Sequence, residues 1–203
     1  MRKECVVTGS EFAAAMGLNP YCSRAKLVKQ KIGLLPRDEV NEYVQFGTDS
    51  EPYVAKAYDS AFACNSRTFG FVTYERDGVK VGCSPDRVAD GRLIEIKCSY
   101  RERYSVEPYH LPQLLAQTVM MGVPVVDYVT WAPSQVDSRG CMTLNVARVS
   151  FDPSLWEKHV WPALVYFKSL VDRKLTTRVN TAEKKELSDA FTRLTSIENP
   201  FTR

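Results

Sequence analysis

The sequence is poor in the residues that bind zinc or build a disulfide framework. None of its six cysteines forms a Cys-x-x-Cys pair, and only His110 and His159 accompany them. This scarcity disfavours a zinc site or an iron–sulfur cluster. The chain also lacks a run of about 18 apolar residues, as a membrane span needs, and its first residues, MRKECVVTGSEF, lack the apolar stretch of a signal peptide. We therefore expect an intracellular protein with reduced cysteines and no membrane partner.

A strong charge of either sign is missing as well. The net charge of +3 and the isoelectric point near 8.5 permit a nucleic-acid partner without arguing for one. The 203 residues are 44% hydrophobic, which is enough for one sizeable core, and no internal repeat or long linker interrupts them. We expect a single domain over residues 1–203, with its core at about residues 2–175 and a C-terminal helix and tail at 176–203.

The order of the expected elements indicates a mixed α/β domain. Hydrophobic spacing predicts helices at residues 8–18, 23–33, 40–64, 109–123, 152–175 and 181–194, and strands within residues 68–98, 126–133 and 141–151. Pro52 and Pro162 predict a kink or a restart of their helices, because proline lacks the N–H group that the helix uses. The tail at residues 195–203 is expected to be irregular.

Residues 82–98, GCSPDRVADGRLIEIKC, predict two short strands around an Asp90-Gly91 turn. Counting outward from that turn pairs Arg87 with Ile94, Asp86 with Glu95 and Ser84 with Lys97. Glu95 and Lys97 share one face, and Asp86 joins them across the ladder, while Ile94, Ile96 and Cys98 face a core. Pro85 cannot donate to the ladder and predicts a bulge or an edge there.

Two carboxylates at this spacing repel each other by about 4 kcal/mol at an effective dielectric constant of about 20. A lysine offsets part of that repulsion, and a divalent cation offsets more. Ligands that are all oxygen atoms favour Mg²⁺ or Mn²⁺. The pattern therefore indicates metal-assisted hydrolysis of a phosphodiester. The alternative that the residues leave open is a solvated hairpin with a surface salt bridge.

The stretch GCSPD…LIEIKC resembles the PD-(D/E)xK nuclease motif, and more narrowly the lambda exonuclease and YqaJ-type viral recombinase family. Three further segments resemble that family in the same order: VVTGSEFAAAMG, FGTDSEPYVAKAY and YHLPQLLAQTVMMG. The resemblance spans about residues 2–131. It implies a restriction-endonuclease-like α/β core, in which helices flank a central mixed sheet.

The resemblance also implies roles for individual residues. Asp86, Glu95, Glu51 and the main-chain carbonyl of Ile96 would hold the metal, and Lys97 would contact the water and the scissile phosphate. Gln113 takes the place of the first glutamine in the family's Gln-x-Gln motif, whose second glutamine is replaced by a leucine at position 115. The candidates for binding the 5′-phosphate or the DNA are Ser10, Ser84, Arg2, Lys3, Arg101 and Gln117.

The loop after the strand ending at Cys98 contains Tyr100, Arg101, Arg103 and Tyr104. These side chains are candidates to stack on DNA or to clamp it. A charge-rich surface loop explains them equally well.

The resemblance implies a Mg²⁺-dependent exonuclease, with Mn²⁺ as a substitute, that degrades linear double-stranded DNA from its ends in the 5′ to 3′ direction. It also implies recombination with a single-strand annealing protein, a ring-shaped homotrimer, and a location in a bacterial host's cytoplasm or an infected cell's nucleus. One alternative is an endonuclease or RNase on the same fold. The other is a nucleic-acid-binding module with a vestigial site.

Overall fold

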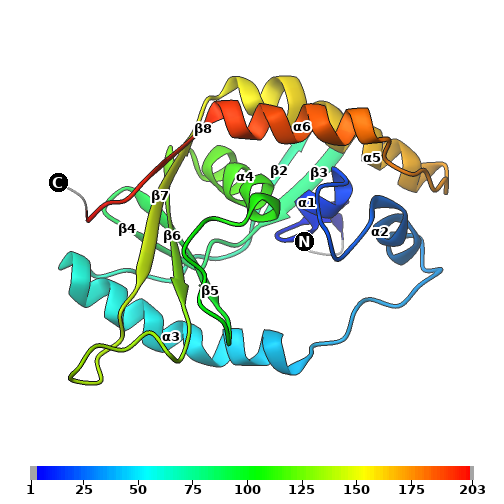
Figure 1. Cartoon of the computed structure of the whole chain (residues 1–203). Coiled ribbons are helices and arrows are strands. Elements are labelled where there is room, and N and C mark those ends of the chain that lie inside the picture. The colour runs from blue at the N-terminus through cyan, green and yellow to red at the C-terminus, as the bar shows by residue number, and fades with distance from the viewer. Residues whose placement is uncertain (1–3, 202–203) are drawn as a thin grey trace.

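The computed structural model describes residues 4–201 and contains two sheets (Figure 1). The larger sheet is mixed and has the order β4-β5-β6-β7-β8, with β5 and β6 parallel and the other pairs antiparallel. Its strands are β4 (Arg87–Ala89), β5 (Arg92–Cys98), β6 (Val125–Trp131), β7 (Asn145–Phe151) and β8 (Thr195–Glu198). The smaller sheet has the order β1-β3-β2 and consists of β1 (Val7–Thr8), β2 (Val72–Arg76) and β3 (Val79–Cys83).

Helices cover both faces of the larger sheet (Figure 1). They are α1 (Glu11–Ala15), α2 (Arg24–Lys31), α3 (Glu42–Phe62), α4 (Leu111–Met121), α5 (Trp161–Asp172) and α6 (Thr181–Leu194), with a 3₁₀ turn at Pro108–His110 and a π turn at Trp156–Val160. On one face, Val54 and Tyr58 of α3 pack against Ile94, Ile96 and Val129 of the sheet. The expectation that Ile94 and Ile96 face a core is therefore confirmed.

The larger core lies on the other face and includes α1, α2, α4, α5 and α6. This core contains buried residues from Val6 to Phe191, and those from α6 are Leu187, Ala190 and Phe191. Arg24 of α2 is almost fully buried, donates to the carbonyl of Ala15 and pairs with Glu183 of α6 at 2.6 Å. The C-terminal helix is thereby fastened to the N-terminal helices.

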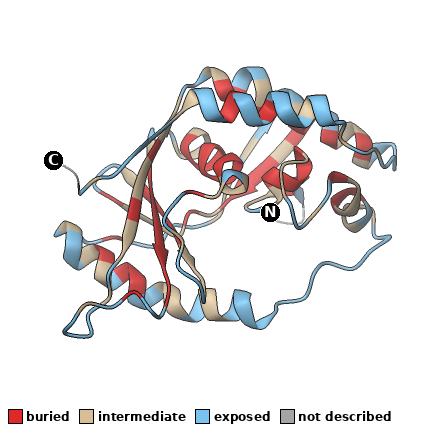
Figure 2. Ribbon diagram, in the orientation of Figure 1, coloured by how far each residue is buried: buried red, intermediate tan, exposed pale blue. Residues whose placement is uncertain are grey.

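Burial divides α3 into two halves (Figure 2). Its C-terminal half carries the buried Val54, Ala55 and Tyr58, while residues 42–45 and the preceding segment 34–41 are exposed. The N-terminal half of α3 therefore extends past the core and is free to form a wall of a cavity. Within residues 4–201, no helix combines the length and the apolar character needed to cross a membrane.

Two Asp-Gly hairpins are present, one at Asp77-Gly78 and the expected one at Asp90-Gly91, and their registers follow from the turn geometry. Asp77 and Gly78 have φ values of 53° and 71°, and Asp90 and Gly91 have 47° and 72°. Positive φ at both central residues is what a type I′ turn requires. The second turn pairs Arg87 with Ile94 and Ala89 with Arg92, as expected.

The structure differs from two expectations about irregular segments. Of the kink or restart expected at Pro52, the restart is wrong, because α3 continues from Glu42 to Phe62. Pro52 removes one helix hydrogen bond, but its ring is exposed, and the packing of the following turns maintains the helix. The tail is not irregular either, because Thr195–Glu198 pairs with β7 as the edge strand β8.

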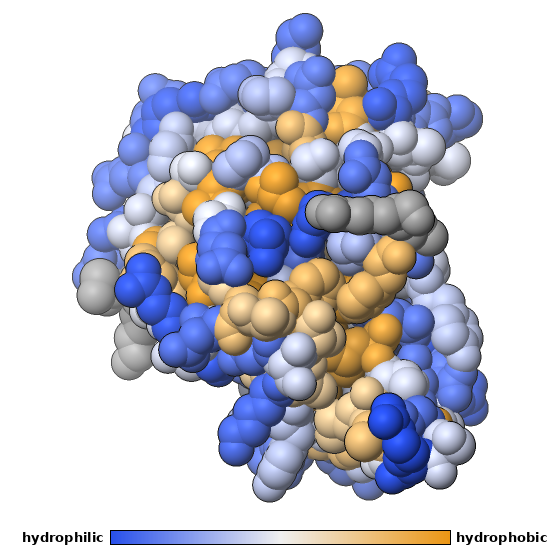
Figure 3. Space-filling model, turned by 90° about the vertical axis from the view of Figure 1, so that its left-hand side faces the viewer, coloured by the Kyte–Doolittle hydropathy of each residue, from blue (hydrophilic) through white to orange (hydrophobic). Residues whose placement is uncertain are grey.

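The face that carries β8 and the C-terminal end of α3 has hydrophobic side chains across its middle, between hydrophilic margins (Figure 3). The rings of Phe62 and Phe201 lie 5.0 Å apart there, and Ile197 is half-exposed. These contacts hold the end of the chain against α3, which gives the short edge strand a second attachment.

Candidate active site

A cavity of about 1060 Å³ lies between α1 and α2 on one side and the N-terminal half of α3 on the other. Glu51 of α3, Asp86 and the residues Ile96 and Lys97 of β5 line its polar part. Ser10, at the start of α1, lines it from the opposite side. The fold thus brings to one cavity residues that are up to 100 positions apart in the sequence, from Ser10 to His110.

Glu95 lies deeper than these residues, with only 1% of its surface exposed. Both of its carboxylate oxygens have amide partners from α4: Gln113 Nε2 donates to Oε1 at 2.6 Å, and Gln117 Nε2 donates to Oε2 at 2.7 Å. Lys97 Nζ also donates to Oε1. Gln117 is completely buried, so this glutamine supports Glu95 and does not face the cavity where a DNA contact was expected.

Asp86 is held differently from the expected cross-strand pair with Glu95. The β4–β5 ladder ends at Arg87, because Pro85 separates β3 from β4 and cannot donate to a continued ladder. Asp86 Oδ2 instead accepts a hydrogen bond from the main-chain N–H of Ile96 at 2.7 Å. The expected pairing of Ser84 with Lys97 is wrong for the same reason, and the Ser84 hydroxyl donates to the carbonyl of Phe69 at 3.4 Å.

The carboxylates at this site repel one another. Burial raises the pKa of Asp86 well above its ordinary value, and the neighbouring Glu95 carboxylate raises it further. Burial and Glu95 also raise the pKa of Glu51. Burial acts to lower the pKa of Lys97, but the carboxylates of Glu95 and Asp86 outweigh that effect and raise it. The two carboxylates therefore favour the charged form of Lys97, which suits an anionic phosphate.

The donor set fits a divalent cation of the Mg²⁺ type. Glu51, Asp86, Glu95 and the Ile96 carbonyl would supply only oxygen ligands, and one lysine offsets three carboxylates. As arranged, no three histidine, cysteine, aspartate or glutamate side chains among residues 4–201 are close enough to hold a metal ion. Lys97 and two amides donate to the oxygens of Glu95, and the Ile96 N–H donates to one oxygen of Asp86.

Of the other residues proposed from the sequence to bind the 5′-phosphate or the DNA, some line the cavity and some do not. Ser10 makes no side-chain cap hydrogen bond at α1, where Glu11 accepts from the Thr8 N–H instead at 2.8 Å. Arg101 is exposed and does not line the cavity, whereas Arg103 does. Arg2 and Lys3 lie outside the described residues. The roles assigned to these side chains stay predictions.

His110 is a cavity residue that the sequence did not single out. Its Nδ1 lies 2.7 Å from the hydroxyl of Tyr128, which is aligned with Glu95 across the parallel β5–β6 pair. Burial, with Lys97 as the second cause, lowers the pKa of His110 to about 3. A lone histidine before a helix carries no sequence signal for this position, because the contact depends on β6.

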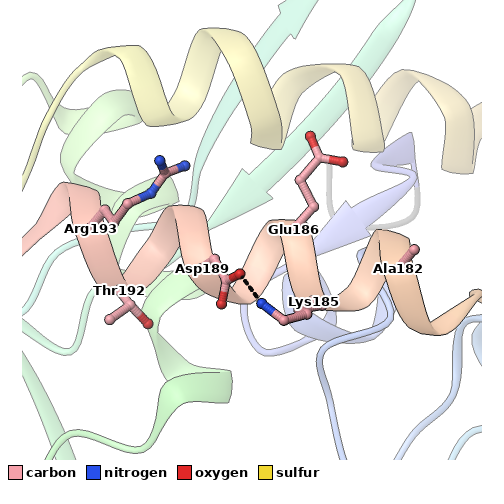
Figure 4. Close-up of a pocket in the computed structure, with 6 residues that line it drawn as sticks. All are labelled: Ala182, Lys185, Glu186, Asp189, Thr192 and Arg193. Atoms are coloured by element: carbon pink, nitrogen blue, oxygen red, sulfur yellow. Dashed lines mark hydrogen bonds and ion pairs between the residues drawn. The ribbon is translucent and has the colours of Figure 1, made fainter.

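A second hollow, of about 540 Å³, lies along the exposed side of α6 (Figure 4). All its lining residues come from that one helix: Ala182, Lys185, Glu186, Asp189, Thr192 and Arg193. Lys185 and Asp189 pair with each other at 2.6 Å, one helical turn apart. This pairing is typical of a solvated helix surface, so the hollow is not a candidate site.

The repulsion between carboxylates predicts the stability of Asp86→Asn without divalent metal. Because the pKa of Asp86 is raised in the folded state, that state binds more protons than the unfolded chain, and ionisation of Asp86 destabilises the fold as pH rises from its ordinary value. Asparagine keeps an oxygen acceptor for the Ile96 N–H but carries no charge. We expect the variant in EDTA to melt no earlier than the parent chain, with a Tm difference in its favour that grows between pH 5 and pH 8. A large loss of Tm at pH 8 would instead reveal a structural partner of the carboxylate.

Comparison with known proteins adds a family and a fold. The model of the YqaJ-like viral recombinase domain matches residues 1–120. An alkaline exonuclease from Laribacter hongkongensis is similar in structure, with 22% identity, a TM-score of 0.67 and 95% of each chain covered. The structure of the same exonuclease in complex with dAMP matches with 21% identity, the same TM-score and the same coverage.

A phage-related exonuclease from Haemophilus somnus matches with 12% identity and a TM-score of 0.59, covering 83% of this chain and 96% of its own. No curated protein sequence matches the chain. The structural matches confirm the expected PD-(D/E)xK fold, a mixed α/β core with helices on both sides of its sheet.

Proposed function

This chain is a nuclease of the YqaJ-like viral recombinase domain family, and from that premise we propose that it is a Mg²⁺-dependent exonuclease. Its substrate in this proposal is the end of linear double-stranded DNA, degraded from 5′ to 3′. The observation that carries the proposal is the convergence of Glu51, Asp86 and Lys97 on one cavity, with Glu95 directly behind them.

When bound by Glu51, Asp86, Glu95 and the Ile96 carbonyl, a divalent metal supplies neutralisation of the phosphate charge and activation of the attacking water. The chain's own residues provide the positioning. Lys97, kept charged by its carboxylate neighbours, binds a phosphate oxygen and stabilises the charge that develops on it. Gln113 and Gln117 fix the orientation of the Glu95 carboxylate.

The opposite end of the cavity supports the recognition of a strand end. Ser10 lies at the start of α1 and has a hydroxyl that the helix does not use as a cap. It is our candidate to bind a terminal 5′-phosphate. The structure of the similar Laribacter exonuclease with dAMP supports a deoxynucleoside monophosphate as the product.

The proposal predicts that linear duplex DNA is shortened from its ends and that closed circles stay intact. The measurement is a gel assay with Mg²⁺ on duplexes labelled on one strand, carrying either a 5′-phosphate or a 5′-hydroxyl. We expect loss of the 5′-terminal label first and faster digestion of the phosphorylated end. Nicking of closed circles would favour the endonuclease alternative, and digestion of RNA alone would favour an RNase. Binding without cleavage in Mg²⁺ or Mn²⁺ would favour the vestigial module.

The remaining parts of the proposal concern assembly and location. We propose a ring-shaped trimer that passes its 3′ overhang to a single-strand annealing protein, in a bacterial host's cytoplasm or an infected cell's nucleus. The family resemblance supports these parts. Sedimentation of the purified chain as a monomer at micromolar concentration, with and without DNA, would contradict the trimer.

A further inference from the structure

His110 brings to the active-site cavity a ring nitrogen that no step of the proposed reaction uses. The residue lies directly before α4 and lines the cavity together with Asp86 and Lys97. Its Nδ1 lies 2.7 Å from the hydroxyl of Tyr128. Its Nε2, at the opposite edge of the ring, makes no hydrogen bond with any residue among 4–201, and it is not one of the side-chain atoms buried there without a partner. Nε2 is therefore accessible from the cavity.

The hydroxyl of Tyr128 determines which ring nitrogen of His110 carries the hydrogen. Tyr128 is only 1% exposed, and burial raises its pKa, so the hydroxyl keeps its proton. Within the part of the chain that the structure describes, His110 Nδ1 is its only hydrogen-bond partner. Because a buried hydroxyl hydrogen rarely lacks an acceptor, the hydroxyl donates to Nδ1. The hydrogen of the neutral ring is then on Nε2.

The surroundings of His110 keep its ring neutral. Burial lowers the pKa of His110, and the positive charges of Lys97 and Arg103 lower it further. Both cations line the same cavity as His110. A neutral N–H can donate to an anion without adding a third positive charge, which would repel Lys97 and Arg103. An anion bound by Lys97 therefore has a second, uncharged donor close by.

Resting on the proposed nuclease function, we propose that His110 donates its Nε2–H to a non-bridging oxygen of the scissile phosphodiester, beside Lys97. A hydrogen bond to a charged oxygen is shorter and stronger than one between neutral groups. The position before α4 suits this ligand as well, since the amino-terminal end of a helix carries a partial positive charge. His110 is then a substrate-binding residue, and Tyr128 is a positioning residue that acts only through the ring.

The test uses amide side chains to separate the two ring nitrogens. Glutamine places its amide nitrogen near the position of Nε2, so His110→Gln keeps a donor for the phosphate. Asparagine places its amide near the position of Nδ1, so His110→Asn keeps only a partner for Tyr128. The measurement is the fluorescence anisotropy of a labelled linear duplex with a 5′-phosphate, in Ca²⁺ instead of Mg²⁺, with a gel to check that the duplex stays intact.

The expected pattern is a loss of binding that glutamine restores and asparagine does not. His110→Ala and His110→Asn should weaken binding about tenfold, whereas His110→Gln should stay within about threefold of the parent chain. Tyr128→Phe leaves the ring free to move its hydrogen to Nδ1, and it should weaken binding about threefold. In Mg²⁺, kcat/KM on the linear duplex should fall about tenfold in His110→Ala and His110→Asn.

A chemical change in the DNA tests which phosphate His110 contacts. A methylphosphonate replaces one charged non-bridging oxygen with a methyl group. At the phosphodiester nearest the 5′ end, it should weaken binding by the parent chain about threefold more than binding by His110→Ala, because the variant has already lost the donor. At a linkage deep inside the duplex, the two chains should lose the same amount.

The matched control is His159→Ala, which removes the only other histidine of the chain. His159 lies in the π turn at Trp156–Val160 and does not line this cavity, so the variant should bind like the parent chain. Circular dichroism and Tm identify the folded variants. Tyr128→Phe and His110→Gln retain most of the native side-chain volume, so they stay informative if His110→Ala unfolds.

Binding by folded His110→Ala equal to that of the parent chain would overturn the proposal. So would recovery by His110→Asn without recovery by His110→Gln, since His110 would then serve only to support Tyr128. The two proposals fail separately. The expected binding pattern without hydrolysis in Mg²⁺ contradicts the nuclease, and hydrolysis by His110→Ala at the parent rate contradicts only the contact of His110.

Discussion

Lys97→Ala and Asp86→Asn are each expected to reduce the hydrolysis of linear duplex DNA by about 10²–10³-fold, the typical cost of removing one group that helps stabilise charge in a transition state. Lys97 is the lysine closest to the three carboxylates, and no other lysine lines the cavity among the described residues. Asp86→Asn removes one negative ligand but keeps the oxygen that accepts from the Ile96 N–H. Initial rates on end-labelled duplex in Mg²⁺ measure the effect.

The controls for this prediction separate chemistry from folding. Asp189→Asn and Lys185→Ala change an exposed carboxylate and an exposed lysine on α6, outside the cavity, and should keep the activity of the parent chain. Circular dichroism and Tm should show that Lys97→Ala and Asp86→Asn are folded. Activity of Lys97→Ala equal to that of the parent chain would contradict the assigned role of the cation.

Local sequence signals were sufficient wherever a short-range rule fixes the geometry. The Asp90-Gly91 turn determined the pairing of Arg87 with Ile94, because only one register closes a two-residue type I′ turn. Strand alternation then placed Glu95 and Lys97 on one face and Ile94 and Ile96 on the other. These features need only neighbours within the hairpin.

Prediction was less accurate for features that depend on contacts between segments far apart in the sequence. The sequence predicted that Pro85 would disturb the ladder. It did not predict that Asp86 would accept a hydrogen bond from the Ile96 N–H, because this contact depends on how the chain bends between β3 and β4. Gln117 was expected to contact DNA, because the sequence does not show which face of α4 packs against the sheet. In the structure Gln117 is buried and donates a hydrogen bond to Glu95. Helix α3 continues through Pro52 because packing outweighs local propensity.

Asp127 is the clearest case of a residue that the sequence gave no reason to select. It lies in the middle of the apolar strand β6 and is completely buried. Its carboxylate accepts from the hydroxyl of Tyr58 at 2.6 Å and from Arg148 Nε and Nη2 at 2.8 and 2.9 Å. Tyr58 lies seven residues after Glu51 on α3, so Asp127 helps fix the helix that carries a candidate metal ligand.

Asp127→Ala is therefore expected to lower the free energy of unfolding by about 1–3 kcal/mol, because the buried hydroxyl of Tyr58 and the partly buried Arg148 lose their common acceptor. Urea unfolding followed by circular dichroism measures the loss. Asp127→Asn should lose less, since an amide oxygen still accepts from Tyr58 or Arg148. Asp189→Ala, which breaks an exposed pair on α6, should cost less than about 1 kcal/mol. Equal stability of Asp127→Ala and Asp189→Ala would contradict the role of Asp127 as an anchor of α3. A large loss of stability in Asp127→Ala would support that role. If Asp127→Asn also needs a higher Mg²⁺ concentration for half-maximal activity, the anchor is connected to the position of Glu51.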